Sequence, residues 1–292
     1  MTSRIVDVCK PLIGVVHLPP LPGSPGYARR PYPMVHGKTW GFNDIVEYAV
    51  GEALKYEEAG FDAVIVENYG DKPYSMRASP GQVAALSVVA REVAKSVSMP
   101  VGVNLLRNSG YEIIYVAYVS RSKFIRINSL CESRVTGEGI MRPAAYDVAR
   151  AVSELNLYSD LFRGDFTILA DVDVKHSRPL GSRYDVREAT RDCIERSGLQ
   201  LGAIIATGSH TGEEPEPGYV EEIASVARSL NVKVFVGSGV SLDNLPSYWK
   251  AADGFIVGSS VKIGGITENP VSVEKAKSMV KLAQHYRKLT KC

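Results

Sequence analysis

Apolar runs of strand length alternate with amphipathic stretches of helix length along this chain, and this alternation constrains its fold more than any other feature. Each run ends at glycine or polar residues before the next helical pattern begins, at a repeat of about 35 residues. Strands that alternate with helices in this way lie parallel in one sheet, with the helices as crossovers. Eight such units in 292 residues predict an α/β chain that folds as one (β/α)8 barrel, or TIM barrel, over residues 1–292.

The predicted strands are rich in β-branched residues and lie at Pro11–His17, Phe61–Asn68, Pro100–Leu105, Lys123–Asn128, Phe166–Asp173, Leu201–Thr207 and at the starts of Val234–Val240 and Gly254–Ser260. The predicted helices lie at about Asn43–Ala59, Pro80–Val97, Ser109–Val119, Pro143–Leu157, Asp185–Ser197, Pro217–Leu230, Ser241–Lys250 and Ser272–Leu289. No GxGxxG motif follows the first strand and the chain contains no Walker A motif, which favours the closed barrel over an open nucleotide-binding sheet.

A proline-rich segment follows the first strand. Leu18–Gly26 contains so many prolines that it can form neither a helix nor a central strand. With the residues that follow it makes a long loop, and long loops inside compact domains are usually functional. We expect the loop of residues 19–42 to lie over the mouth of the barrel.

Two glycine-serine turns end the last two predicted strands. They contain Gly237, Ser238 and Gly239 in the first turn, and Gly258 and Ser259 in the second. Glycines leave backbone N–H groups accessible, and a following helix adds its positive N-terminal end. TIM barrels often bind phosphate in the loops after strands seven and eight. We therefore predict a C-terminal phosphate-binding site with Gly208 as a further donor; the alternative is that these residues only make tight turns.

The segment Asp171–His176 holds the densest group of ionisable residues at a predicted strand end. Side chains alternate along a strand, so Asp171, Asp173 and Lys175 are expected on one face, pointing into the barrel. A lysine between carboxylates can relay a proton, or can form a Schiff base if the carboxylates lie farther away. The alternative is a salt bridge that closes the barrel top.

Further polar side chains follow the other predicted strands, where TIM barrels carry their chemistry. Glu67 and His17 join Asp171, Asp173 and Lys175 as predicted catalytic residues. The predicted substrate-binding residues are Asn104, Arg107, Arg126, Asn128, His176 and Thr207. Glu67 with Asp171 or Asp173 could bind Mg²⁺, or Glu67 could pair with Arg126 or Lys175. No cofactor is evidently required, and no metal-ligand motif supports a resident metal.

Composition narrows the classes of partner and compartment. The net charge of +2 and the lack of a basic arm argue against nucleic-acid binding. No apolar run approaches the roughly 20 residues of a transmembrane helix, although peripheral membrane association stays open. Without a signal peptide, we expect a cytoplasmic protein, with a homo-oligomer plausible. The scarcity of glutamine favours a thermophilic source.

The four cysteines are Cys9, Cys131, Cys193 and Cys292, and none belongs to a CxxC pair. We expect free thiols in a reducing cytoplasm, with one disulfide as the alternative.

Several segments match one family pattern: Gly14–Pro25, Val66–Asp71, Gly102–Asn108, Phe124–Asn128, Ala170–His176, Val236–Val240 and Ala252–Gly258. With these motifs the chain resembles the BtpA family of TIM-barrel proteins, which includes a protein of a sugar operon. Ser129–Arg134 departs from the family pattern, which usually has an apolar and glycine-containing stretch there. The resemblance implies a TIM barrel with a C-terminal phosphate site.

Two functions follow. The first is an enzyme of the isomerase, aldolase or lyase type that acts by acid-base chemistry on a small phosphorylated metabolite, either a sugar phosphate or a nucleotide-like compound. The second is a non-catalytic biogenesis factor, because the resemblance includes a cyanobacterial protein linked to photosystem I biogenesis. An assembly factor predicts an exposed apolar patch, for which Leu18, Leu21 and Tyr27 are the candidates.

Overall fold

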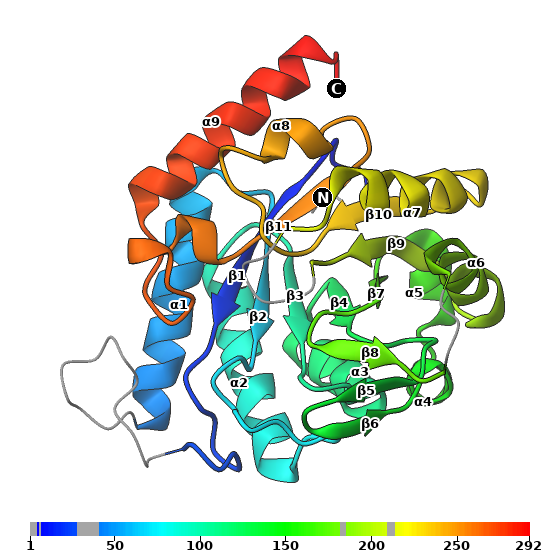
Figure 1. Cartoon of the computed structure of the whole chain (residues 1–292). Coiled ribbons are helices and arrows are strands. Elements are labelled where there is room, and N and C mark those ends of the chain that lie inside the picture. The colour runs from blue at the N-terminus through cyan, green and yellow to red at the C-terminus, as the bar shows by residue number, and fades with distance from the viewer. Residues whose placement is uncertain (1–4, 6, 28–40, 182–184, 209–213) are drawn as a thin grey trace.

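The computed structural model describes residues 5, 7–27, 41–181, 185–208 and 214–292. Its centre is a closed barrel of eight parallel strands, as the sequence predicts (Figure 1). The strands are β1 (Leu12–His17), β2 (Ala63–Glu67), β3 (Val101–Asn104), β4 (Phe124–Ile127), β7 (Thr167–Val172), β9 (Leu201–Ala206), β10 (Lys233–Val236) and β11 (Gly254–Val257). They follow one another around the barrel in chain order, which is the TIM-barrel topology.

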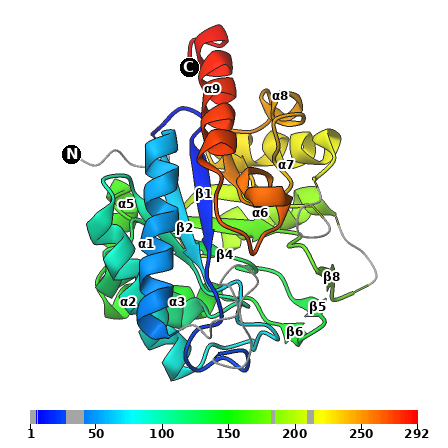
Figure 2. The same cartoon turned by 90° about the vertical axis from the view of Figure 1, so that its left-hand side faces the viewer.

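Helices connect the strands and cover the outside of the barrel, as Figures 1 and 2 show from two sides. They are α1 (Phe42–Ala59), α2 (Pro80–Ser96), α3 (Gly110–Ser120), α4 (Ala145–Glu154), α5 (Tyr158–Arg163), α6 (Val186–Arg196), α7 (Pro217–Ser229), α8 (Leu245–Tyr248) and α9 (Val273–Leu289). Local sequence sets several of these ends. Ser79 and Gln82 form a capping box at the start of α2, and Gly60 ends α1 in the left-handed conformation at φ 91°.

Alternate residues of the strands fill the inside of the barrel. Ile13 and Val15, for example, belong to an inner apolar cluster that is separate from the larger cluster between strands and helices. Glycine makes room for its large rings, since a Cβ at Gly102 would lie 2.3 Å from the ring of Phe124. Two positions beyond these apolar residues, toward the carboxyl ends of the strands, the inward side chains become polar. The period of two thus places the candidate site directly above the inner core.

Two expected elements differ from the structure. The helix predicted at Ser241–Lys250 is only the four-residue α8, and Ser259–Val261 is a short 3-10 turn that directly follows the second glycine turn. A three-stranded antiparallel sheet was not predicted; it contains β5 (Arg134–Thr136), β6 (Gly139–Met141) and β8 (Ser177–Pro179). These strands rise from the loops after β4 and β7, and form a rim beside the barrel mouth (Figure 1).

The proline-rich loop after β1 turns inward. Leu18 and Leu21 are fully buried, so the apolar surface expected there is wrong. Buried Asp71 accepts a hydrogen bond from the Leu21 N–H at 2.7 Å and holds the loop against the end of β2. The rest of the loop predicted to cover the mouth falls on residues 28–40, outside the described residues.

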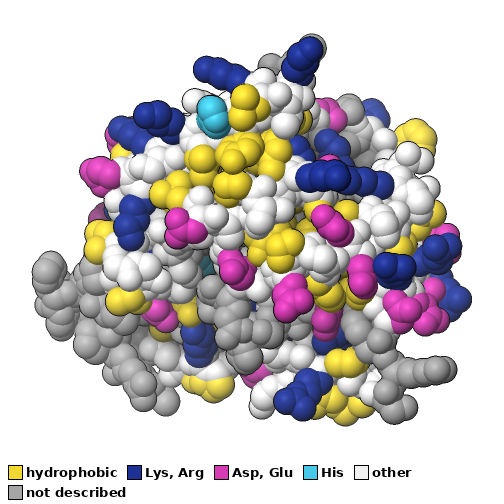
Figure 3. Space-filling model, turned by 45° about the horizontal axis from the view of Figure 1, so that its top comes forward, with side chains coloured by type: hydrophobic (Ala, Val, Ile, Leu, Met, Phe, Trp, Pro, Cys, Tyr) yellow, Lys and Arg dark blue, Asp and Glu magenta, His cyan; other side chains and the backbone are white. Residues whose placement is uncertain are grey.

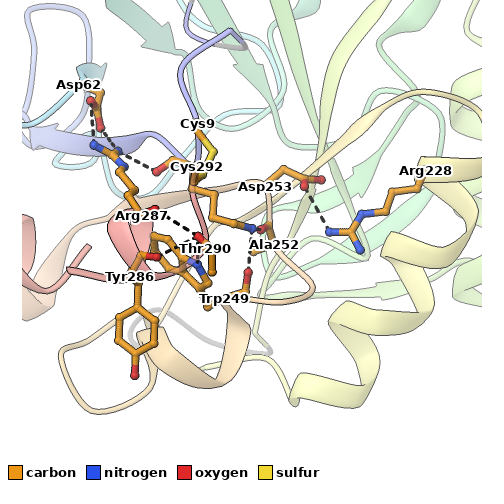
Figure 4. Close-up of a disulfide and its surroundings, with 11 residues drawn as sticks. Cys9, Asp62, Arg228, Trp249, Ala252, Asp253, Tyr286, Arg287, Thr290 and Cys292 are labelled. Carbon is orange, nitrogen blue, oxygen red and sulfur yellow. Dashed lines mark hydrogen bonds and ion pairs between the residues drawn. A yellow bond between two sulfur atoms is a disulfide. The ribbon is translucent and has the colours of Figure 1, made fainter. Parts of the chain in front are cut away.

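A disulfide joins Cys9 to Cys292, so the expectation of free thiols is wrong for these two residues (Figure 4). It lies at the amino end of the barrel strands, opposite the polar inner layer. Cys131 and Cys193 are free thiols. Among the described residues, no helix is long and apolar enough to cross a membrane.

Candidate active site

One row of polar side chains crosses four neighbouring strands at the carboxyl end of the barrel. Strand register pairs His17 with Glu67, Glu67 with Asn104, and Asn104 with Arg126. All four are buried. Strands β1 to β4 therefore deliver an imidazole, a carboxylate, an amide and a guanidinium at one level.

A paired arginine and aspartate form the floor of the site. Arg126 donates to Asp171 through Nε at 2.9 Å and through Nη2 at 2.8 Å, and Asn128 Nδ2 donates to the same carboxylate at 3.3 Å. Both members of the pair are almost completely buried. This bidentate contact keeps the Arg126 guanidinium in place. The geometry thus gives Asp171 an anchoring part, where the sequence suggested a catalytic one.

Glu67 and His17 lie on the other side of the cavity. Glu67 Oε2 accepts a hydrogen bond from Asn104 Nδ2 at 2.7 Å, and its Oε1 lies 3.9 Å from His17 Nε2. Burial lowers the pKa of His17 well below its ordinary value, and the positive charges of Lys262 and Lys175 add to the effect. The imidazole is therefore neutral near pH 7. Its Nδ1 has no hydrogen-bond partner among the described residues.

Lys175 follows β7 and is held by its backbone. Its N–H donates to Thr207 Oγ1 at 3.2 Å, and its carbonyl accepts from Arg107 Nη2 at 3.0 Å. Burial, followed by the charge of Arg126, lowers the pKa of Lys175 from 10.5 to about 8, although Glu67 and Asp171 oppose the shift. The side chain is partly exposed and lines two adjoining cavities.

Asp173 does not share the face of Asp171 and Lys175, contrary to the expected alternation. Strand β7 ends at Val172, and Asp173 adopts a left-handed backbone with φ 52°. Its carboxylate points to the rim, where it pairs with Arg134 and accepts from the Tyr219 hydroxyl at 2.8 Å. The predicted trio is therefore a pair, because the strand stops before the pattern is complete.

The two glycine turns meet the polar row. Gly237, Ser238, Gly239, Gly258 and Ser259 line a cavity of about 30 Å³ together with His17, Glu67, Arg126 and Lys175. A Cβ at Gly237 would lie 2.2 Å from Ile205, and a Cβ at Gly258 would lie 3.0 Å from His17. Close packing therefore requires glycine at position 237, and a side chain at position 258 would displace His17 slightly.

Some backbone N–H groups of the predicted phosphate site already donate hydrogen bonds within the protein. The Gly237 N–H donates to the Ala206 carbonyl at 2.8 Å, and the Gly208 N–H donates to Ser238 Oγ at 2.9 Å. A one-turn helix and a 3-10 turn follow the two loops, so a long helix adds no dipole there. Of the expected donors, Gly239, Gly258 and Ser259 remain the candidates.

A second cavity of about 850 Å³ adjoins the first and opens beside the rim sheet. His176, Thr207, Gly208, Tyr219 and Lys175 are among the residues that line it. His176 is exposed, whereas Thr207 is buried and supports the backbone of Lys175. Predicted residues that end or follow β1, β2, β4, β7 and β9 thus line two cavities that share Lys175.

The sequence reasoning missed Glu132 and Arg134. Glu132 Oε2 accepts from the Asp173 N–H at 2.9 Å, and its Oε1 accepts from fully buried Arg134 at 3.0 Å. Glu132 lies in the loop after β4 and Arg134 begins the three-residue strand β5, which is too short for a recognisable period, so no pattern signalled their position at the rim. The one sign in the sequence was that Glu132 and Arg134 have opposite charges and lie two residues apart.

The described residues contain no group of three or more His, Cys, Asp or Glu side chains that could hold a metal ion. Within the expected Mg²⁺ set, Asp171 and Asp173 are bound to arginines and Glu67 to Asn104. A bound Mg²⁺ stays a prediction, and it would have to replace these contacts.

Similar proteins were found by sequence and by structure. An uncharacterised protein of Pyrococcus horikoshii is 42% identical over 278 residues, covering 95% of this chain and 97% of its own. The photosystem I biogenesis protein BtpA of Synechocystis is 38% identical over 258 residues, covering 87% and 81%. Relatives in thermophilic archaea agree with the scarcity of glutamine.

Two solved structures illustrate the likeness in fold. Dimeric phosphoribosylanthranilate isomerase of Thermotoga maritima, solved as engineered monomers, has a TM-score of 0.55 at 12% identity, covering 94% of this chain and 99% of its own. The 2-keto-3-deoxy-6-phosphogluconate aldolase of Zymomonas mobilis has a TM-score of 0.52 at 13% identity, covering 97% and 96%. At such identities the likeness extends to the barrel alone.

The family model that describes the BtpA family matches residues 8–285, almost the whole chain. The matched range contains the strand ends that carry His17, Glu67, Arg126 and Lys175. By this match and by its relatives, the chain belongs to the BtpA family.

Proposed function

We propose that this protein is a cytoplasmic enzyme that moves a proton beside the carbonyl group of a small phosphorylated metabolite, as isomerases, aldolases and lyases do. The observation that carries the proposal is the position of Lys175. It belongs to the walls of both cavities, the small one at the glycine turns and the large one at the rim. A substrate that spans the two spaces would pass the Lys175 amine.

The electrostatics of Lys175 suit a proton acceptor. With a pKa of about 8, the amine is uncharged in an appreciable fraction of molecules at neutral pH. The carboxylate of Asp171 does not compete for it, because Arg126 occupies both oxygens. No hydrogen bond joins Lys175 Nζ to a described residue. An unshifted lysine would be protonated and inert as a base.

Glu67 is the second acid-base group of the proposal. It lines the small cavity together with Lys175 and is oriented by a hydrogen bond from Asn104. Neutral His17 cannot deliver a proton as an imidazolium, so we assign it hydrogen bonding to the substrate. Two acid-base groups that line one cavity can remove a proton from one position of a substrate and return it at another.

The glycine turns are the proposed phosphate site. Gly239, Gly258 and Ser259 lie in the loops where TIM barrels commonly hold phosphate. The names of both similar enzymes, a phosphoribosylanthranilate isomerase and a phosphogluconate aldolase, describe phosphorylated substrates. This likeness supports the substrate class and leaves the individual compound open.

An assembly factor is the second candidate, and one surface favours it. A shallow groove at the amino end of the barrel is lined by Pro246, Trp249, Tyr286 and Leu289. Hydrophobic side chains gather on this face, with lysines and arginines around them (Figure 3). The Synechocystis relative is named as a photosystem I biogenesis protein. A partner protein that shields the groove would support this function.

The test begins with a thermal-shift screen of the whole chain against phosphate, sugar phosphates and nucleotides, with and without Mg²⁺. A ligand at 100 times its Kd stabilises the folded protein by about 2.7 kcal/mol and raises its Tm. We then follow exchange of substrate hydrogen for solvent deuterium with each compound that binds. Lys175→Met should bind but not exchange, whereas the exposed-lysine control Lys95→Met should do both.

Full exchange by Lys175→Met would contradict the mechanism. Absence of any shift with all phosphorylated compounds would contradict the substrate class and leave the assembly factor as the better proposal.

A further inference from the structure

Two cysteines from distant parts of the chain meet beside the rim of the candidate site. Cys131 lies in the loop after β4, and Cys193 lies in α6, 62 residues later. Their Sγ atoms are 2.6 Å apart, and Cys131 Sγ also lies 3.5 Å from the Cys193 carbonyl oxygen. These are the two thiols that remain when Cys9 and Cys292 are joined.

The separation of the two sulfurs is too short for atoms that are merely in contact. Non-bonded carbon atoms rest at about 3.5–4.0 Å, and sulfur is the larger atom. A disulfide bond measures about 2.05 Å, so a movement of about half an ångström would form one. The backbone already places both side chains face to face.

We propose that Cys131 and Cys193 form a second disulfide, which fixes the loop after β4 against α6. Two thiols release two protons and two electrons as the S–S bond forms. The electron acceptor is a low-molecular-weight disulfide, which is cleaved to two thiols. Cys131 is partly exposed, so its thiolate can attack the low-molecular-weight disulfide first. Cys193 is buried behind it and then displaces the mixed disulfide.

The bond would act on the rim of the candidate site through the next residue. Glu132 accepts from the Asp173 N–H at 2.9 Å and from Arg134 at 3.0 Å, and Asp173 is two residues before Lys175. Fixing Cys131 therefore fixes the carboxylate that orients the start of the Lys175 segment. The same loop, Ser129–Arg134, is where the chain departs from the family pattern.

The first experiment isolates this pair of thiols. The variant Cys9→Ser/Cys292→Ser contains only Cys131 and Cys193, and is equilibrated with oxidised or reduced glutathione, denatured and treated with iodoacetamide. We expect no alkylation after oxidation and two alkylated cysteines after reduction. Two alkylated cysteines after oxidation, or a glutathione adduct on Cys131 alone, would overturn the proposal. If the variant does not fold, cross-linked peptides of the oxidised wild-type chain supply the same answer.

The second experiment measures what the bond does. A disulfide of this loop length should raise the Tm of the oxidised form by about 5 °C or more over the reduced form. Hydrogen exchange in residues 129–134 should be slower in the oxidised form. In the matched variants that add Cys131→Ser or Cys193→Ser to the same background, both differences should vanish. Equal Tm and exchange in the two redox forms of the parent would overturn the claim that the bond fixes the loop.

Discussion

The two ends of the barrel use charged side chains for different purposes. At the amino end they tie chain segments together: Lys10 Nζ donates to the carbonyls of Trp249 at 2.7 Å and Ala252 at 2.5 Å, while Arg287 pairs with Asp62 and Arg228 with Asp253 (Figure 4). At the carboxyl end they bind one another around a cavity, as Arg126 binds Asp171.

This difference teaches where stability and chemistry reside. Contacts at the amino end hold the segment before β1 against the ends of α8 and α9. At the carboxyl end, desolvated groups such as Lys175 and His17 have pKa values shifted away from their ordinary values, which burial without full pairing produces. TIM barrels commonly separate the two tasks in this way. Substitutions at each end should therefore fail in different assays.

The largest expected effect is on activity at the carboxyl end. Lys175→Met should lower the rate of the proposed proton exchange by about 10²–10⁴-fold, because it removes the base. Stability should not fall and should rise near pH 7, since the lost ammonium is partly desolvated and has no hydrogen bond to a described residue. Kinetics with the compound from the ligand screen and chemical denaturation measure the two quantities. A variant that unfolds instead would place Lys175 among the structural residues.

The buried Arg126–Asp171 pair should carry the largest effect on stability. Arg126→Met leaves the Asp171 carboxylate buried without its main partner, which costs about 3–5 kcal/mol of unfolding free energy. The double variant Arg126→Met/Asp171→Leu should recover most of this loss, because an apolar pair carries no uncompensated charge. Urea denaturation measures both. Equal losses in the single and double variants would show that packing, and not charge, makes the difference.

At the amino end, a substitution should lower stability and leave ligand binding unchanged. Cys9→Ser/Cys292→Ser should lower the free energy of unfolding by about 2–4 kcal/mol, because the bond restricts the unfolded chain. Ligand binding at the mouth should stay as in the wild type. Denaturation under matched oxidising conditions and the ligand thermal shift test the two statements. Loss of ligand binding in the folded variant would mean that the two ends are coupled.

The smallest expected effect concerns pH. Because the pKa of Lys175 is about 8 in the folded chain and near 10.5 when unfolded, the unfolded chain binds more protons between these values. Stability from this group therefore rises as pH increases from about 8 to 10.5. Wild type and Lys175→Met, compared by urea denaturation along this range, should converge at high pH. A constant difference would place the pKa of Lys175 near its ordinary value.

The fold was largely predictable because its signals are local and repeated. Each β-branched run and each cap, such as Gly60 after α1, acts within a few residues. The three-residue strands of the rim sheet carry no such period and were missed. Of the helix expected at Ser241–Lys250, only Leu245–Tyr248 forms a turn of helix.

The sequence identified several residues that line the small cavity, but it did not predict the contacts between them. Strand ends identified His17, Glu67, Arg126 and Lys175. Which carboxylate binds Arg126 depends on the register of β4 and β7, and the left-handed backbone of Asp173 breaks an alternation that looks regular in sequence. A disulfide between residues separated by 283 positions leaves no spacing to recognise.

The Cys9–Cys292 bond has a topological consequence, because it turns nearly the whole polypeptide into a covalent ring. A single cut in an exposed turn, such as Gly137–Glu138 between β5 and β6, would leave one linear molecule with new ends and the old ones joined. A force that pulls residues 9 and 292 apart would be borne by the sulfur bridge and not by the barrel. An unfoldase that threads the polypeptide through a pore would therefore have to pull two chain segments through at the same time when it reaches the disulfide.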